Sequence, residues 1–295
     1  MSSADTALVG TSPRSSANWG RRRHLAELVG NRELLANLTL RELRSRYKKS
    51  VLGWTWSLIN PLANVAIYSI VFSIFLKVQP PTGHPSGLKS FPFFLLCALV
   101  PWTFFANGLV QSTESLLLNA NLIKKTYFPR ELLVMASVGS VAITMLIETA
   151  VLAVILLIAG NMVLVWLPVV LVLIALQAVL VLGIGLLLSV LNVYFRDFRY
   201  LITILLQVLF YATPIVYPIS YVPRNSTVLG VRLPVRYIYN LNPLTRLMEA
   251  YRSVLYETRF PAAGTWAIVI GSALAALAVG WAVFGRLQRR VAEEV

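Results

Sequence analysis

The chain has 295 residues, of which 57% are hydrophobic and only 13% are charged. Soluble domains have about 45–50% apolar and about 25% charged residues, because polar groups must cover their surfaces. The composition therefore excludes an ordinary soluble domain, and membrane topology explains a net charge of +14 better than nucleic-acid binding does.

About fifty residues precede the first long apolar run. Residues 1–20 are rich in Ser, Ala and Thr without periodicity, which predicts a disordered cytoplasmic tail. Residues 21–53 predict an amphipathic helix that lies at the cytoplasmic interface of the membrane. Its expected apolar arc consists of Leu25, Leu28, Val29, Leu35, Leu40, Leu43, Tyr47 and Val51, while Leu34 and Leu38 break the pattern.

Six further segments are long and apolar enough to cross a bilayer, which takes about 20 residues. They lie near residues 54–78, 92–113, 132–159, 163–191, 200–218 and 265–285. Pro214 and Pro218 interrupt the outer end of the fifth segment. The expected fold class is an all-α integral membrane protein, with six transmembrane helices in one domain over 54–290 and a short cytoplasmic tail over 291–295.

Residues 219–264, between the last two predicted spans, are neither a span nor an ordinary loop. Asn242 can cap a helix, Pro243 suits its first position, and apolar residues then repeat at helical spacing. The segment predicts an outward re-entrant helical hairpin that dips into the outer leaflet, where its backbone must be covered by protein or line a wet cavity.

The basic residues sort by side if both termini are cytoplasmic. Eighteen of the 26 Lys and Arg residues then lie inside, ten of them within residues 1–53. Because Lys and Arg accumulate on the cytoplasmic side, this distribution predicts a multi-pass protein with cytoplasmic N- and C-termini.

Catalytic and metal-binding motifs are absent from the sequence. It contains no P-loop and no H-E-x-x-H pattern, and its single cysteine, Cys97, is expected to be a small buried residue. We therefore expect no catalytic residue, metal or cofactor in this chain. Glu148 is the one acid deep in a predicted span, so it is either functional or held by a hydrogen bond from Ser, Thr or Tyr on a neighbouring helix.

Three groups of residues resemble the permease subunits of ATP-binding-cassette exporters for cell-envelope polysaccharides, such as O-antigen, teichoic acid, capsule and lipid-linked galactan. They are LRELRSRYKKSVLGWTWSLINPL (40–62), NANLIKKTYFPRELL (119–133), and NVYFRDFRYL (192–201) with ATPIVYP (212–218) and LNPLTRLMEAYR (241–252). The resemblance covers roughly residues 30–290. It implies a transport subunit in the cytoplasmic membrane of a prokaryote.

In this family the cytoplasmic loop between the second and third spans forms a coupling helix that docks on a separate ATPase subunit. The resemblance implies such a helix at about Leu117–Thr126, within a loop over 114–131, and places ATP and Mg in the partner. The implied coupling residues are Leu122, Ile123, Lys124, Lys125, Tyr127, Phe128, Pro129, Arg130 and Glu131. The apolar members are expected to be buried in the ATPase groove, and the charged ones to fix the register.

The resemblance further implies a homodimer of permeases with two ATPase subunits, with a polyprenyl-diphosphate-linked glycan passing between the two copies. Aromatic rings stack on sugar faces without one fixed hydrogen-bond pattern, and the expected lining is Tyr68, Phe72, Phe75, Tyr211 and Tyr217. The residues expected to attract the diphosphate are Arg44, Arg46, Lys48 and Lys49 on the inside and Arg246 and Arg252 at the exit. Helix packing or lipid contact is the alternative reading for the aromatic residues, and general attraction to anionic lipid is the alternative for the basic ones.

Three other functions compete with glycan export. A permease for drugs or other lipids would share the fold. A membrane-embedded polyprenyl-phosphate transferase would need clustered acids for a divalent cation, which the spans do not contain. A non-energised channel or scaffold would need no ATPase partner.

Overall fold

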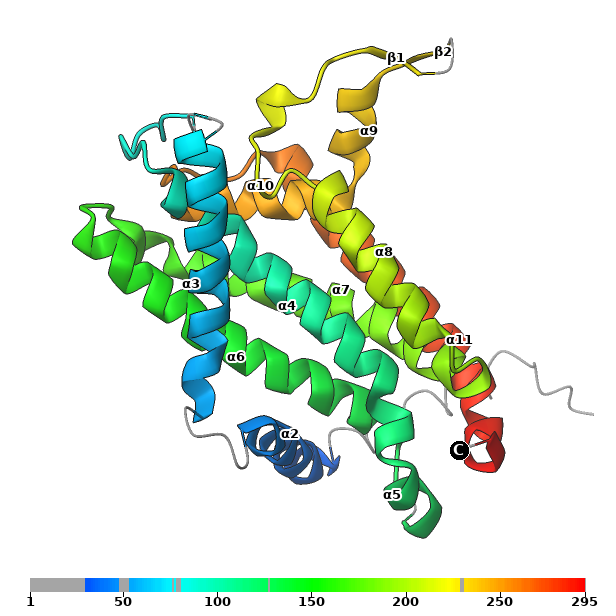
Figure 1. Ribbon diagram of the computed structural model, residues 1–295. Helices are drawn as coiled ribbons and strands as arrows, with labels where there is room; N and C mark the ends of the chain where they lie inside the picture. Colours follow the sequence, from blue (N-terminus) through cyan, green and yellow to red (C-terminus); the bar gives the residue numbers. More distant parts are fainter. Residues whose placement is uncertain are drawn as a thin grey trace, which may run out of the picture.

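The computed structural model describes residues 30–47, 53–75, 77, 81–126, 128–228 and 231–294, and most of them are helical (Figure 1). The helices are α2 (Arg32–Tyr47), α3 (Trp56–Ser69), α4 (Phe91–Leu118), α5 (Ala120–Lys125), α6 (Glu131–Ile158), α7 (Leu167–Tyr194), α8 (Phe198–Ala212), α9 (Val235–Leu241), α10 (Pro243–Leu255) and α11 (Ala263–Glu294). A π-helical turn, Ile70–Phe75, extends α3, and 3-10 turns lie at Gly53–Thr55, Val163–Trp166 and Ile219–Tyr221. Strand β1 (Ser226–Val228) pairs antiparallel with β2 (Val231–Leu233).

Five helices in the described part of the chain are long and apolar enough to span a membrane. They cover Leu58–Phe75, Phe91–Leu118, Glu131–Ile158, Val163–Tyr194 and Ala263–Gln288, and each coincides with a predicted span. The remaining prediction, residues 200–218, corresponds to α8. Its 15 residues rise only about 22 Å, whereas the hydrocarbon core is about 30 Å thick. The all-α membrane class is therefore confirmed, with five candidate spans.

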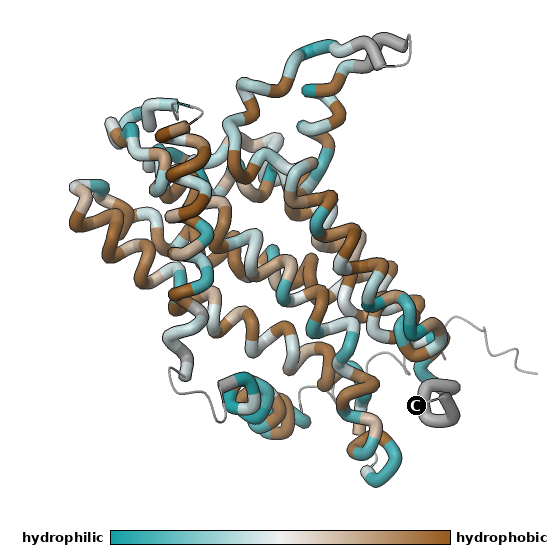
Figure 2. Tube along the Cα trace, viewed as in Figure 1, coloured by the Kyte–Doolittle hydropathy of each residue, from teal (hydrophilic) through white to brown (hydrophobic). Residues whose placement is uncertain are grey.

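The elements outside the long helices gather at two ends of the molecule. Helices α2 and α5 and the C-terminal end of α11 lie at one end, called here the α5 end (Figure 1). Helices α9 and α10, the two strands and the loop over 81–90 lie at the other, called the α10 end. Hydrophilic residues concentrate at these ends, while the helices between them are mostly hydrophobic (Figure 2). This is the distribution that a bilayer requires.

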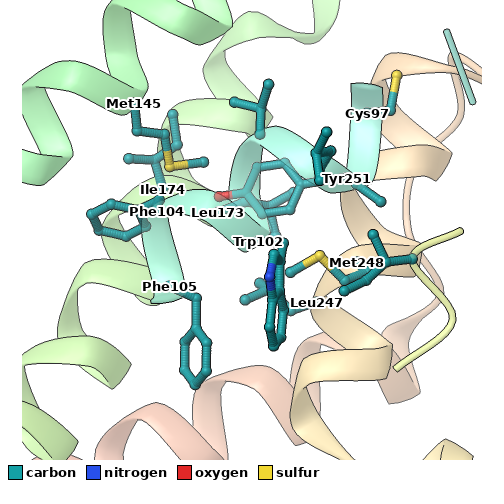
Figure 3. Packing of buried hydrophobic residues seen from close by; sticks show 14 of the residues in the cluster. Cys97, Trp102, Phe104, Phe105, Met145, Leu173, Ile174, Leu247, Met248 and Tyr251 are labelled. Carbon is teal, nitrogen blue, oxygen red and sulfur yellow. The ribbon is translucent and has the colours of Figure 1, made fainter. Parts of the chain in front are cut away.

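The main core lies where α10 packs against α4 and α7. Tyr251, Leu247 and Met248 of α10 are fully buried and lie beside Trp102 of α4 (Figure 3). Cys97 belongs to the same cluster and is fully buried, as expected. Tyr251 donates a hydrogen bond to Gln177 of α7 (2.9 Å), and Gln177 donates to the Pro101 carbonyl of α4 (2.7 Å). These bonds satisfy polar groups at a depth where water cannot.

Helices α7 and α11 approach each other backbone to backbone through two glycines. A Cβ added to Gly280 would lie 1.8 Å from the Gly183 carbonyl oxygen, and one added to Gly183 would lie 2.3 Å from the backbone of Ala276 and Leu277. Small residues allow this close packing between membrane helices, where dispersion and packing drive association. The last span is therefore fixed on the side of α7.

The predicted helix after Asn242 is confirmed in the segment 219–264. The Asn242 side chain accepts a hydrogen bond from the Leu244 amide (2.9 Å), and Pro243 occupies the first position of α10. Helix α9 precedes it, as the prediction of short helices required, whereas the β1–β2 pair was not predicted.

Candidate functional site

The loop between α4 and α6 contains a short helix, α5, where the coupling helix is expected. Lys124 and Lys125 are exposed in its last turn. Ile123 is only 8% exposed and belongs to a hydrophobic cluster that also contains residues of α2, α4, α6, α7 and α11. Leu122 and Phe128 are partly buried against the same cluster. The expectation that Ile123 is free to enter a partner's groove therefore needs correction, because this side chain is buried within the chain itself. For the partly buried Leu122 and Phe128 that expectation stays a prediction.

The residues that follow α5 also contact the chain itself. The Arg130 guanidinium donates to the carbonyl of Gln288 near the end of α11. Glu131, expected to face a partner, is 1% exposed at the start of α6. Pro129 is half-buried, and Tyr127 lies outside the described residues. Of the predicted coupling residues that the structure describes, the two lysines present the most accessible side chains.

Helix α2 packs on α6 and contacts the loop that contains α5. Its buried side chain is Leu38, which breaks the predicted apolar arc, whereas Leu40 of that arc is 42% exposed. The Arg41 guanidinium donates to Asn119, the residue between α4 and α5. Helix α2 is thus joined to the start of this loop by a polar contact, and Leu38 and Ile123 belong to the same hydrophobic cluster.

The basic residues predicted to attract a diphosphate on the inside have different surroundings. Arg44 is exposed on α2. Arg46 is half-buried and donates to the Ser140 hydroxyl of α6 (2.7 Å). Lys48 and Lys49 lie outside the described residues. Arg46 is therefore positioned by the protein, while Arg44 faces its surroundings.

A cavity of about 450 Å³ lies between the last turn of α2, the first turns of α3, and α4 and α6; we call it the polar cavity. It is lined by Arg46, Trp56, Asn60, Pro61, Asn64, Thr103, Phe104, Asn107, Gln111, Val141, Thr144, Met145 and Glu148. Most of these side chains carry a polar group, although α3, α4 and α6 are apolar spans. Polar groups at such depth need a partner, a ligand or water.

The amides of the polar cavity were missed in the sequence reading, although a signal was present. Asn60 and Asn64 are four apart on α3, and Thr103, Asn107 and Gln111 repeat at the same interval on α4. Side chains four apart lie on one face of a helix. Two polar rows in otherwise apolar spans therefore indicate a wet or ligand-binding face.

Glu148 faces the polar cavity from α6 and is 8% exposed. It has no hydrogen-bond partner among the described residues, so the structure does not support the reading in which Ser, Thr or Tyr on a neighbouring helix holds it. The Thr144 hydroxyl, one turn earlier, instead donates to the Ser140 carbonyl of its own helix (3.2 Å). The carboxyl of Glu148 is thus available to whatever occupies the cavity.

Towards the α10 end, rings from α3, α4 and α8 form a continuous group that we call the aromatic row. Its members are Tyr68, Phe72, Phe91, Trp102, Phe210 and Tyr211. Tyr68 stacks on Phe210 with centroids 5.9 Å apart, and Phe210 also contacts Trp102 (5.6 Å) and Tyr211 (5.1 Å). The row joins α3 directly to α8 through Tyr68 and Phe210, and it joins both helices to α4 through Phe91 and Trp102. The three helices are labelled in Figure 1.

The five predicted lining aromatics are only partly brought together. Tyr68, Phe72 and Tyr211 belong to the aromatic row, and Tyr211 is 62% exposed. The Tyr217 hydroxyl donates to the Tyr211 carbonyl (2.8 Å), which holds it beside the row. Phe75 is 74% exposed at the end of the π-helical turn. The set is thus a packed group of rings with two exposed members rather than a uniform lining.

The two arginines predicted at the exit differ sharply. Arg252 is 6% exposed, and its guanidinium donates to the carbonyls of Pro214 (2.6 Å), Ile215 and Phe94 (3.3 Å). The guanidinium also lies 3.7 Å from the centre of the Phe94 ring. The prediction that Arg252 meets a diphosphate therefore needs correction, because this side chain fastens the end of α8 to α4 and α10.

Arg246 is half-buried at the start of α10. It donates to the Asn240 carbonyl (2.8 Å) and pairs with Glu249 (3.5 Å). It also lines a cavity of about 490 Å³ at the α10 end, together with Glu257 and Arg259. Arg246 keeps access to this cavity, so the prediction of an exit contact still applies to it.

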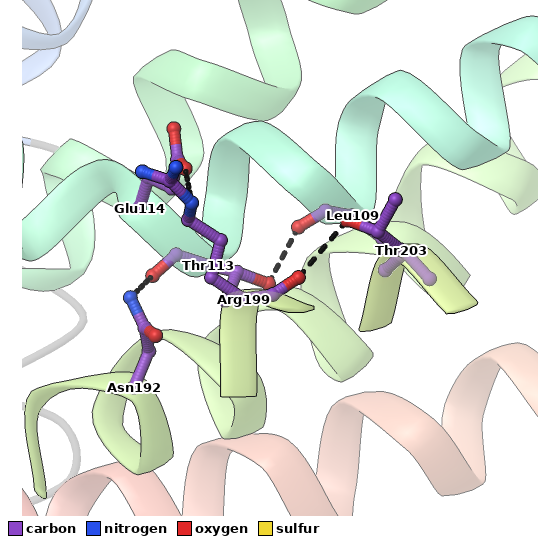
Figure 4. A network of polar contacts seen from close by, with 6 residues as sticks. All are labelled: Leu109, Thr113, Glu114, Asn192, Arg199 and Thr203. Carbon is purple, nitrogen blue, oxygen red and sulfur yellow. Dashed lines mark hydrogen bonds and ion pairs between the residues drawn. The ribbon is translucent and has the colours of Figure 1, made fainter. Parts of the chain in front are cut away.

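At the α5 end, α8 is tied to α4 by polar contacts. Arg199 of α8 pairs with Glu114 of α4 at 3.3 Å (Figure 4). Asn192 of α7 donates to the Thr113 carbonyl (3.0 Å) one residue earlier. Because α4 leads directly into α5 through Asn119, a movement of α5 would reach α8 through this contact.

The chain is similar to known proteins over most of its length. The O-antigen export system permease protein RfbA of Klebsiella pneumoniae is 30% identical over 271 residues, which span 88% of this chain and 94% of that protein. RfbA of Myxococcus xanthus is 29% identical over 246 residues, covering 81% of this chain and 86% of its own. The polysialic acid transport protein KpsM of Escherichia coli is 26% identical over 235 residues, or 74% and 79% of the two chains.

A family model described as ABC-2 type transporter matches residues 33–256, from α2 to the end of α10. The match includes the polar cavity, the aromatic row and α5. It also includes the stretches that carry the resemblance, which are residues 40–62, 119–133, 192–201, 212–218 and 241–252. The chain is a multi-pass membrane permease that belongs to the ABC-2 type transporter family.

Proposed function

We propose that this chain is the membrane subunit of an ATP-driven exporter that carries a polyprenyl-diphosphate-linked polysaccharide across the cytoplasmic membrane. The observation that carries the proposal is the similarity over 88% of the chain to an O-antigen export permease. The sequence has no P-loop, so ATP and Mg bind to a separate ATPase subunit. This chain is a transport subunit and not an enzyme.

The α5 end faces the cytoplasm in this proposal. The ten basic residues within 1–53 support this orientation, as do Lys124, Lys125 and Arg130 beside α5. Both termini are then cytoplasmic in a prokaryotic cell membrane. The α10 end faces outward, with residues 219–264 forming the re-entrant hairpin, and α8 with residues 213–218 makes the sixth crossing.

The functional unit is a homodimer of this chain with two ATPase subunits. The exposure of α3 supports this assembly. Only 11% of the residues in its apolar stretch are buried within one chain, whereas 72% are buried in the apolar stretch of α4. Helix α8 also exposes apolar residues such as Leu201, Ile204 and Val208. A second copy would cover these faces and enclose the conduit between the two chains.

The ATPase docks on α5, with Lys124 and Lys125 supplying charge complementarity. The buried contacts of Ile123 and the Arg130 bond to α11 then transmit the movement into the bundle. A short helix fixed to several neighbours transmits a rigid displacement better than a mobile loop does.

Glycan passage is attributed to the faces of α3, α4 and α8. The exposed ring of Tyr211 and the half-buried ring of Tyr68 offer stacking surfaces to successive sugars. Arg44, with Lys48 and Lys49, attracts the diphosphate on the cytoplasmic side, and Arg246 contacts it on exit.

Depletion of this protein in its own cells tests the proposed function. Lipid-linked polysaccharide is expected to accumulate on the cytoplasmic side, and the purified permease is expected to carry stoichiometric ATPase subunits. Accumulation of a small amphipathic drug or a glycan-free lipid instead would assign the chain to another substrate class. Normal surface polysaccharide after depletion would contradict the proposal.

A further inference from the structure

We propose that the polar cavity is a binding subsite for sugar residues of the exported glycan, which it recognises through their hydroxyl groups. The identity of the ligand as a glycan depends on the proposed function, whereas the need for a polar ligand follows from the cavity itself. None of the sequence motifs or comparisons assigns a role to this cavity.

The cavity contains polar groups that the protein leaves unsatisfied. The Gln111 side-chain oxygen is buried without a hydrogen-bond partner in the described structure, and the Glu148 carboxyl has none. Asn60, Asn64 and Asn107 also make no side-chain hydrogen bond to other described residues. A buried polar group without a partner costs about 1–3 kcal/mol, so the buried Gln111 oxygen and Glu148 carboxyl favour an occupant that can donate and accept. The three asparagine side chains are exposed, so they are accessible to such an occupant.

The charges of the cavity favour a neutral polyhydroxyl ligand. Its lining has one carboxyl, Glu148, and one guanidinium, Arg46, and the latter already donates to Ser140. A divalent cation needs several oxygen ligands with more than one carboxylate, and a phosphate favours clustered Arg or Lys. Side-chain amides with one carboxyl can pair with hydroxyls, which both donate and accept.

The size and position of the cavity also fit a sugar. A volume of about 450 Å³ lies within the range of about 300–1,000 Å³ typical of small-molecule sites. Trp56 and Phe104 provide ring surfaces beside the amides. The cavity begins at α2 and the first turns of α3, at the α5 end, so a glycan entering from there meets hydrogen-bonding groups before it reaches the aromatic row.

A cysteine-protection experiment tests the subsite in the complete exporter. Cys97 is the single cysteine, so Cys97→Ala provides the background for Asn107→Cys in the cavity and for Asn37→Cys on the exposed face of α2 as the matched control. Inverted membrane vesicles are prepared from cells that make their lipid-linked glycan and from cells in which its synthesis is blocked. The probe is a charged methanethiosulfonate reagent.

The reagent is expected to label Asn107→Cys about tenfold more slowly in glycan-containing vesicles than in glycan-free vesicles. The labelling rate of Asn37→Cys is expected to be the same in both. Only unoccupied sites react, so a tenfold slower rate corresponds to a cavity that is occupied about nine-tenths of the time. Equal labelling of Asn107→Cys in both kinds of vesicle would overturn the proposal.

Substitution provides a second, independent measurement. In Asn64→Leu/Asn107→Leu the cavity keeps its volume but loses two amides, and export is expected to fall about tenfold while the protein still inserts. Asn225→Leu in the outer loop is the matched control.

The failure of this inference is distinguishable from failure of the proposed function. If depletion causes lipid-linked glycan to accumulate but Asn64→Leu/Asn107→Leu exports at the normal rate, only the subsite is wrong. If depletion causes no such accumulation, the exporter assignment itself is wrong. Should the double variant fail to insert, the labelling of Asn107→Cys decides.

Discussion

The polar cavity and the aromatic row both include residues of α3 and α4. They differ in whether their side chains find partners within the protein. In the aromatic row, Phe210 has rings on three sides, so the group is stable without a ligand. In the polar cavity, Gln111 and Glu148 lack partners, so the group requires an occupant. The comparison indicates that the region nearer the α5 end offers hydrogen-bonding groups to a ligand, whereas the region nearer the α10 end offers ring surfaces.

The hydrogen bonds made by residues next to each region differ as well. Near the aromatic row, the Arg252 guanidinium donates to carbonyls of residues 94, 214 and 215, which joins α10 to α4 and to the segment after α8. The polar cavity is backed by α6, where Ser140 and Thr144 bond mostly to their own helix. Arg46 adds one long-range bond at the cavity, to the Ser140 hydroxyl, whereas the buried guanidinium of Arg252 makes three.

Arg252→Met should give the largest effect, because it removes the buried guanidinium that joins α10 to α4 and to residues 214–215. Three buried carbonyls lose their donor, which costs about 3–5 kcal/mol of stability. The measurement is thermal unfolding of the purified protein in detergent. Arg246→Met, at a half-buried position on the same helix, is the control. Equal losses of thermal stability in both variants would show that the buried contacts of Arg252 stabilise the protein no more than those of Arg246.

Phe210→Ala comes next, since it removes the ring that joins α3, α4 and α8. Loss of a half-buried ring with three ring partners should destabilise the protein by about 2 kcal/mol. Phe195→Ala, which breaks only the Phe195–Phe198 pair, should cost less. If the two variants unfold at the same temperature, the row is not a structural unit.

Tyr68→Leu tests whether this ring of the aromatic row contributes to polymer transit or only to the stability of the fold. Polymer transit should slow about three- to tenfold as one stacking surface is lost, while ATPase docking is unchanged. Tyr68→Phe retains the ring and should restore transit. The readout is the rate at which polysaccharide appears on the cell surface, and reduced docking in place of slower transit would indicate a folding role for this face.

Lys124→Ser/Lys125→Ser acts outside both regions, at the docking end. Exposed charges contribute about 0.2–1 kcal/mol each, so ATPase affinity should fall by a few-fold, more at low salt than at high salt. ATP hydrolysis should then be uncoupled from export. Lys89→Ser at the α10 end is the control, and export at the normal rate by the double variant would remove α5 from the coupling path.

Arg199→Gln should have the smallest effect on stability. Its ion pair with Glu114 is half open to solvent and is worth at most about 1 kcal/mol. The unfolding temperature should therefore barely change, whereas export should slow if the pair transmits movement from α4 to α8. A marked loss of stability would show that the α5 end is held as firmly as the α10 end.

Much of the fold follows from local patterns. Five of six predicted spans coincide with helices long enough to cross a membrane, the sixth corresponds to the shorter α8, and Asn242–Pro243 begins α10 as predicted. The polar cavity was also present in the sequence as residues four apart on α3 and α4, although its significance depends on the helices that face each other. Local periodicity identifies a face, but it does not identify what that face contacts.

The sequence by itself determined the membrane class, the permease family and the position of α5, because apolar length, charge distribution and short motifs are local properties. Only the tertiary structure decided that Arg252 is buried, that Ile123 belongs to the permease core, and that five polar side chains share one cavity. These facts depend on contacts between residues as much as 158 positions apart, such as Arg252 with Phe94. The physical reason is that burial and hydrogen-bond partners are set by how helices pack, and the same arginine is an exposed charge or a structural donor according to which carbonyls surround it.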